Sequence, residues 1–242
     1  MTIDKDDILT RIKKQGYWRV EFQPLVVDNN RINSLPKCQE IVKNARIQLN
    51  SGWDYPHYFQ DSNNDKYCIS NCNGYIESAV NFGRYKELWR MYRNAQFIHF
   101  FAMKEDYDND DIFPPSNPPV ISKSSLYVIN TIYKFTEIYE FLRRLTKQGI
   151  YKEGVRVYIS LRNTDNRKLL LDDPKRMPLL KDYVVIISEI KFDKTYTEKE
   201  ISEEAENFAL AQIIETLHRF NWNNPPEHTI KNDQKNFLER KI

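Results

Sequence analysis

The sequence of 242 residues predicts an α+β fold, in which a mixed or antiparallel sheet packs with two long helices in a single domain. Strand-like blocks are separated by two long helical segments instead of alternating regularly with helices, so a doubly wound sheet fits less well. Hydrophobic residues make up 40% and aromatic residues 13% of the chain, which is enough for a sizeable core and too much for a disordered protein. Only 6 residues are Gly, which disfavours glycine-rich phosphate loops and flexible linkers.

The first elements are predicted to be a helix, a strand and a second helix. Residues 4–14 place their apolar side chains on one helical face, and Asp4 can cap that helix. Residues 17–25 alternate between apolar and polar side chains, which is typical of a half-buried strand. Residues 36–49 are predicted to form the second helix, with Ser34 as its cap.

Strands are predicted to dominate the next part of the chain. Residues 67–82 fit two strands around an Asn-Gly turn. Residues 85–94 fit either a helix or a strand, and residues 96–103 fit a buried strand. Residues 104–120 combine an acidic run with several prolines. We interpret them as a surface loop inside one domain, because neither half of the chain repeats the other.

The second half contains the two longest predicted helices. Apolar residues recur at helical spacing over 123–147, where Gly149 can end the helix, and again over 198–219. Three further strands are expected, over residues 155–163, 167–173 and 182–192. Residues 1–222 therefore form the predicted domain, and residues 223–242 are expected to be a polar, loosely held C-terminal tail.

Charge and cysteine content limit the setting in which the protein works. Lys and Arg number 36 against 34 Asp and Glu, a smaller basic excess than dedicated nucleic-acid modules have, although a local basic patch stays open. The odd set of Cys38, Cys68 and Cys72 suggests a reducing compartment. Residues 1–16 lack the apolar stretch of a signal peptide, and no stretch approaches 18 apolar residues. We expect a soluble cytoplasmic protein without a membrane partner.

A corner at residues 52–57, Gly-Trp-Asp-Tyr-Pro-His, is the first candidate site. In a functional interpretation Trp53, Asp54 and His57 line a pocket, with His57 titrating near neutral pH. In a structural interpretation Trp53 and Tyr55 pack as core, and Asp54 accepts backbone N–H groups of its own turn. The structural interpretation is favoured on sequence alone.

A second candidate lies in the segment 89–97, where polar donors alternate with aromatic residues. Arg90, Arg93 and Gln96 could bind a phosphate or a stacked base, or the arginine stems could simply cover apolar surface. Together with Arg143, the two arginines form the hypothesis of a sequence-independent nucleic-acid binder.

Carboxylates suggest two weaker enzyme hypotheses. Asp173, Glu189 and Lys191 resemble the pattern of metal-dependent nucleases, in which carboxylates hold Mg²⁺ and a lysine helps to orient water. Glu137 and Glu140 could form an acid–base pair, but solvated charges on a helix face are far commoner. Sequence motifs for a P-loop, a nucleophile elbow or a zinc protease are missing, so no cofactor or metal is expected.

Five segments together carry a family resemblance: RVEFQPL at 19–25, GWDYPH at 52–57, WRMYRNAQFIHFFA at 89–102, TEIYEFLRRL at 136–145 and RFNW at 219–222. The set resembles a family of bacterial proteins of uncharacterised activity. Related stretches occur alone and beside AlbA-like domains of the Schlafen type, which are regarded as DNA-binding. The resemblance covers about residues 17–222 and implies a regulatory or defence setting.

The chain also departs from that family pattern. Asn94-Ala95 stands where members often have Ser-Gly, and Gln23-Pro24 stands where they have Arg-Pro. An anion bound by that arginine in relatives would therefore lose its ligand here. Our expectation is a non-catalytic binding or sensing protein that acts with a partner protein. The nuclease and nucleic-acid hypotheses are the alternatives.

Overall fold

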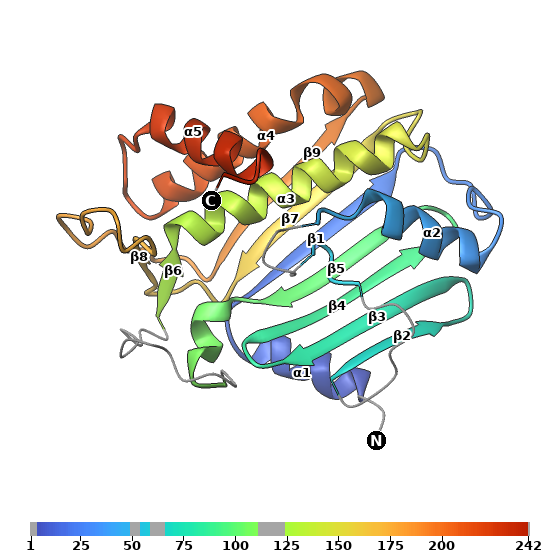
Figure 1. Ribbon diagram of the computed structural model, residues 1–242, viewed down its shortest axis with the longest axis horizontal. Coiled ribbons are helices and arrows are strands. Elements are labelled where there is room, and N and C mark those ends of the chain that lie inside the picture. Colours follow the sequence, from blue (N-terminus) through green and yellow to red (C-terminus); the bar gives the residue numbers. More distant parts are fainter. Residues whose placement is uncertain (1–3, 49–53, 59–65, 111–123, 242) are drawn as a thin grey trace.

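The computed structural model describes residues 4–48, 54–58, 66–110 and 124–241, and its main feature is a seven-stranded antiparallel sheet. The strand order is β2-β3-β4-β5-β1-β7-β9, so the first strand lies inside the sheet (Figure 1). The strands are β1 (Tyr17–Pro24), β2 (Tyr67–Asn71), β3 (Tyr75–Phe82), β4 (Tyr85–Tyr92), β5 (Phe97–Ala102), β7 (Val155–Arg162) and β9 (Glu189–Tyr196). A separate parallel pair joins β6 (Ser125–Tyr127) to β8 (Lys168–Leu170).

Helices cover the two faces of the sheet unequally (Figure 1). α3 crosses one face, with α2 beside it and α4 and α5 packed against it, while α1 contacts β3, β4 and β5. The helices are α1 (Lys5–Lys14), α2 (Leu35–Ala45), α3 (Val128–Lys147), α4 (Glu198–Arg219) and α5 (Glu227–Leu238), and a 3-10 helix, η1, covers Lys104–Asp110. None of the described helices has the length and apolar content needed to cross a membrane.

Two hydrophobic cores follow from this arrangement. The larger one lies between the sheet and α2, α3 and α4, and includes Trp18, Phe22, Phe97 and Phe141. The smaller core lies under α1, where Ile8 and Ile12 pack with buried residues of the sheet. The main sheet contacts of α1 are with β3, β4 and β5. Among the described residues, side chains of β7 and β9 on that side of the sheet, such as Arg156 and Asp193, are partly exposed, and they form one of the candidate surfaces.

The α+β prediction is confirmed, and several predicted elements match closely. Asp4 accepts the N–H groups of Asp6 and Asp7 at the start of α1, and Ser34 caps α2. The Asn-Gly turn joins β2 to β3, with Gly74 at a φ of 85°. α4 spans the predicted residues 198–219 behind a capping box. The ambiguous segment 85–94 is a strand over Tyr85–Tyr92.

Other predicted boundaries are wrong for identifiable reasons. The helix predicted over 123–147 begins at Val128, because the Asp172 carboxylate accepts the N–H groups of Ile129 and Asn130 and fixes the first turn there. The strand predicted over 182–192 begins at Glu189, which pairs with the last residue of β7. The preceding residues have no β7 partner left, so the ladder cannot extend to them.

The segments 104–120 and 223–242 also differ from expectation. Residues 104–110 of the predicted loop form the 3-10 helix η1, and most of the remainder lies outside the described residues. The tail contains α5, whose Phe237 ring stacks on Tyr133 at a centroid distance of 4.5 Å. Asp233 of α5 also forms an ion pair with Arg176 at 2.6 Å. The tail is therefore packed against α3 and is not loosely held over 227–238.

Candidate functional site

The corner at 52–57 packs its second half into the protein. Trp53 lies outside the described residues. Asp54 forms an ion pair with Arg46 at 3.2 Å. Tyr55 is 2% exposed, and its backbone exchanges two hydrogen bonds with Ile47, of 2.7 and 2.9 Å. The structural interpretation of Tyr55 is therefore confirmed, whereas Asp54 faces a guanidinium.

His57 brings the corner into a set of buried titratable side chains on the helix-covered face. We call this set the interior cluster: Tyr55, His57, Glu87, His99, Lys134 and Glu137. His99 Nε2 lies 3.2 Å from Glu87 Oε2, and the same oxygen accepts the His57 backbone N–H at 3.4 Å. Lys134 Nζ of α3 donates to Glu137 at 2.8 Å. The sequence marked His57 as a pocket residue and Glu137 as an acid–base candidate, but no sequence pattern joins the two.

Burial and charge set the protonation states of the interior cluster. Burial lowers the pKa of both His57 and His99, although the nearby Glu87 carboxylate opposes this. Burial alone would raise the pKa of Glu87, but its hydrogen bond to His99 and the nearby Lys134 ammonium lower it. Burial also raises the pKa of Glu137, which Lys134 opposes. Neutral imidazoles therefore face an ionised Glu87 at neutral pH.

The predicted group of Arg90, Arg93, Gln96 and Arg143 does not converge. Arg90 pairs with Glu77 on the neighbouring strand β3. Arg93 donates to the backbone carbonyls of residues 32 and 33 at 3.3 and 3.1 Å. Arg143 lies on α3 and pairs with its neighbour one turn earlier at 2.6 Å. Each arginine therefore binds a different part of the protein, and the acid–base partner proposed for Glu137, Glu140, is engaged by Arg143 and by Arg144.

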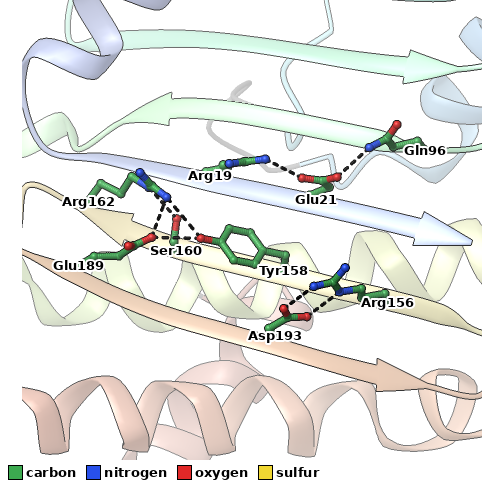
Figure 2. Close-up of polar contacts among 9 residues, drawn as sticks. All are labelled: Arg19, Glu21, Gln96, Arg156, Tyr158, Ser160, Arg162, Glu189 and Asp193. Atoms are coloured by element: carbon green, nitrogen blue, oxygen red, sulfur yellow. Dashed lines mark hydrogen bonds and ion pairs between the residues drawn. The ribbon is translucent and has the colours of Figure 1, made fainter.

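Gln96 leads to a polar surface that was not predicted from the sequence (Figure 2). Its side chain donates to Glu21 at 2.7 Å, and Glu21 pairs with Arg19 at 2.9 Å. These residues lie on the side of the sheet that faces away from α3, and α3 passes behind the strands in Figure 2. We call this group the open face: Arg19, Glu21, Gln96, Arg156, Tyr158, Ser160, Arg162, Glu189 and Asp193. Ser160 is its fully buried member, and its hydroxyl accepts a hydrogen bond from Arg162 at 3.3 Å.

Cross-strand pairs hold the side chains of the open face in place. Arg156 of β7 donates two hydrogen bonds to Asp193 of β9, of 2.8 and 2.6 Å, which is the bidentate geometry that guanidinium and carboxylate groups favour. Glu189 accepts from Tyr158 at 3.0 Å and pairs with Arg162 at 2.8 Å (Figure 2). The Arg156 hydrogen bond lowers the pKa of Asp193. Arg156 and Asp193 both stay charged, and 53% and 42% of their side chains are exposed.

The open face contains a hollow where β1 lies beside β7. A depression of about 330 Å³ is lined by Arg19, Glu21, Gln23, Arg156, Tyr158 and Asp193. The Arg19 guanidinium lies 5.3 Å from the centre of the Tyr158 ring. The hollow thus offers arginines, carboxylates, an amide and a phenol to a polar group that enters it.

Exposed apolar side chains lie in the loop between β8 and β9, which contacts the end of α4 through the stacked rings of Tyr183 and Trp222, 5.1 Å apart. Met177, Leu180 and Ile186 are 80%, 95% and 79% exposed. Backbone hydrogen bonds hold the loop, because Val185 N–H donates to the Arg167 carbonyl at 3.0 Å and Thr164 N–H to the Ser188 carbonyl at 3.1 Å. We call residues 177–187 the apolar loop. It leads directly into Glu189 of the open face.

The proposed nuclease residues separate in the structure. Asp173 pairs with Arg176 at 2.9 Å and caps its own turn, whereas Glu189 binds Tyr158 and Arg162 on the open face. Within the described ranges, the side chains contain no group of three or more His, Cys, Asp or Glu placed to hold a metal ion. The geometry gives the nuclease hypothesis no support.

One sequence signal could have revealed the open face. The segment 155–162 alternates strictly, and its apolar members pack in the core. Its other members are Arg156, Tyr158, Ser160 and Arg162, an arginine- and tyrosine-containing row on the opposite face. A row of arginine and tyrosine side chains on one face of a strand predicts a polar surface that can bind another molecule.

Comparisons with known proteins add no assignment. A scan against family models, a search of curated proteins and a search of solved structures each found no match to this chain. The residues and their geometry therefore carry the functional inference.

Proposed function

We propose that this chain is a non-catalytic binding protein that holds a partner protein on the open face and on the apolar loop that precedes β9. The observation that carries the proposal is the row of cross-strand arginine–carboxylate pairs on the side of the sheet that faces away from α3. The bidentate pair of Arg156 and Asp193 represents this row. The family resemblance contributes the regulatory or defence setting, and that part of the proposal rests on the resemblance.

The composition of the surface supports a protein as the occupant. Arginine and tyrosine are enriched in protein interfaces because they combine apolar area with directed hydrogen bonds. Arg19, Arg156, Tyr158 and Arg162 supply these groups, and their carboxylate partners hold them in fixed positions. Pre-positioned side chains lose little conformational freedom on binding, which favours affinity.

The apolar loop supports the same conclusion. Large aliphatic side chains that are almost fully exposed leave apolar area in water, which an interface would remove. Leu180 and Ile186 are the strongest examples, at 95% and 79% exposure. Exposed apolar side chains together with an arginine-rich polar area have the composition of a protein interface.

The alternative of nucleic-acid binding receives less support. Binding to phosphates needs cations that can exchange their counterions for the backbone. Arg90 and Arg143 are paired with carboxylates, and Arg93 is bonded to backbone carbonyls. Most arginines of the open face likewise face a carboxylate, so a partner with groups of both charges fits better than a polyanion.

The test compares surface variants during gentle purification from the source cells. We expect the wild-type chain to co-purify with a second protein, and Arg156→Glu and Ile186→Asp each to weaken that complex at least about tenfold, as truncation at an interface anchor does. Arg219→Glu and Val27→Asp are matched controls, because Arg219 is an exposed, carboxylate-paired arginine on α4 and Val27 is 74% exposed.

Three results would contradict the proposal. The wild-type protein could emerge alone, or all four variants could retain the partner equally. A companion that disappears after nuclease treatment would instead support nucleic-acid binding. Far-ultraviolet circular dichroism of each variant separates loss of binding from loss of folding.

A further inference from the structure

A second cavity lies away from the open face, where the start of β4 and the end of β5 meet α3. It encloses about 170 Å³, and Phe237 of α5 contributes to its wall. Three more aromatic side chains line it: Trp18, Phe101 and Tyr133. We call this cavity the aromatic pocket.

The aromatic wall suits one planar ring. Trp18 and Phe101 are stacked at 5.6 Å with planes 10° apart, and Tyr133 and Phe237 are stacked at 4.5 Å with planes 19° apart. A cavity of about 150 Å³ accommodates a benzene ring, so this space has room for a single ring with small substituents. A ring that packs against aromatic side chains removes apolar surface from water, which favours its binding.

The carboxylates of the pocket wall are engaged within the protein. Glu137 accepts a hydrogen bond from the Lys134 ammonium at 2.8 Å. Glu87 lies against the His99 imidazole at 3.2 Å. Both belong to the interior cluster, and a cationic ligand would have to compete with these contacts.

The other cations that line the pocket are engaged as well. Lys86 donates to the Gly83 carbonyl at 2.6 Å, and the Arg84 guanidinium lies 5.8 Å from the centre of the Tyr85 ring. Lys104 lies near the carboxylate of the next residue and near the carboxylate that caps α3. An anionic ligand would therefore find no cation left over for it, and a neutral ligand enters without displacing any of these contacts.

Asn130 is the polar side chain of the wall that remains available. It lies in the first turn of α3, is 9% exposed and lines the pocket. Its backbone N–H donates to Asp172 at 3.2 Å, but among the described residues no group bonds its side-chain amide. A buried amide without a protein partner points to a bound group. Because the amide has an N–H donor beside a carbonyl acceptor, it pairs best with an edge that offers the same two groups.

We propose that the aromatic pocket binds a neutral, single-ring heterocycle that carries a hydrogen-bond donor beside an acceptor, as a cyclic amide or a pyrimidine base does. The ring would pack against the aromatic wall, and its polar edge would pair with the Asn130 amide. This site is separate from the open face, so its occupancy does not depend on the partner proposed above.

Calorimetric titration with uracil and 2-pyridone tests the proposal, each beside the form whose N–H groups are replaced by N-methyl groups. We expect at least one parent ring to bind about tenfold or more tightly than its methylated form, because only the parent ring keeps the donor that pairs with an amide. We expect Asn130→Leu, which keeps the approximate shape of the side chain, to reduce this preference to less than about threefold. A preference caused by the size of the methyl group would persist in that variant.

Asn44→Leu is the matched control, because Asn44 is exposed in the last turn of α2 and does not line the pocket. If Asn130→Leu does not fold, Asn130→Ala takes its place. The proposal is overturned if neither parent ring binds at about 5 mM, since such affinity would be too weak for a built site. It is also overturned if benzoate binds more tightly than both parent rings, if the methylated forms bind equally well, or if the Asn130 variant keeps the preference of the control.

Discussion

At the scale of single residues, His99 and Glu87 show how a strand of the central sheet comes to carry a buried charge. His99 is fully buried on β5 and faces the Glu87 carboxylate of β4 at 3.2 Å. The carboxylate stays ionised in the interior because it receives hydrogen bonds and lies near Lys134. The imidazole stays neutral because burial disfavours its charged form.

This arrangement predicts an acid-sensitive fold. Buried imidazoles with a lowered pKa stabilise the native state above about pH 6.5, the value of an unfolded histidine, and that stability is lost as the pH falls below it. Each buried histidine contributes a slope of up to about 1.4 kcal/mol per pH unit. Glu87, whose pKa is lowered by its hydrogen bond to His99 and by Lys134, adds a loss of stability as the pH falls below about 4.5.

Denaturant unfolding at several pH values checks this prediction. We expect the unfolding free energy to fall between about pH 6.5 and 5, with a shallower fall in His99→Gln, which keeps a donor for Glu87. His228→Gln changes an exposed histidine and should follow the wild type. Equal slopes in the wild type and His99→Gln would contradict the assigned role of His99.

At the scale of elements, α5 shows what a weak apolar pattern can conceal. The segment after Trp222 is mostly polar. Within α5, Ile230 and Phe237 are the only large apolar residues whose side chains are buried. Their spacing of seven residues matches one helical face, but two positions are too few to predict a packed helix. The Arg176–Asp233 ion pair adds a contact that depends on tertiary structure.

Truncating Phe237 is therefore expected to destabilise the protein. We expect Phe237→Ala to lower the free energy of unfolding by about 3 kcal/mol, because a buried ring stacked on Tyr133 is removed. Lys235→Ala, at a position 69% exposed on the same helix, should change it by less than about 0.5 kcal/mol. Chemical denaturation measures both values, and an unchanged stability in Phe237→Ala would show that α5 contributes little.

Elements with strong local signals were predictable, and elements defined by distant partners were not. Capping residues fixed the starts of α1, α2 and α4, since the signal lies within one turn. The start of α3 depends on Asp172, which lies 43 residues away from Ile129. The start of β9 depends on where β7 ends. Local patterns contain no information of this kind.

At the scale of the whole molecule, the same distinction explains the candidate sites. Sequence patterns predict His57 and Gln96 as site residues. Each belongs to a larger group, the interior cluster for His57 and the open face for Gln96. Their partners come from several elements, and only the sheet order brings β1 beside β7 and β9. The residues of the nuclease hypothesis lie apart for the same reason, since Asp173 follows β8 of the small parallel pair, whereas Glu189 lies on β9 of the large sheet.

The sheet order also predicts the distribution of local stability. β1 has a neighbouring strand on both sides, and its ladder with β7 spans all eight of its residues. β2 pairs only with β3 and has five residues. We expect amides of β1 to exchange with deuterium at least about tenfold more slowly than those of β2, as measured by mass spectrometry of peptides. Equal exchange in both strands would contradict this order.

The position of β1 has a further consequence during synthesis. The ribosome makes Tyr17–Pro24 early, but one neighbour, β5, follows only after the β2–β3–β4 meander, and the other, β7, emerges after α3. The meander from β2 to β5 can form through local hairpins. Until its neighbours are made, β1 has no strand partner, and apolar side chains such as Val20 and Phe22 have no core to pack into. The nascent chain thus carries an exposed apolar segment until β7, Val155–Arg162, has been made, which makes β1 a binding segment for a holding chaperone.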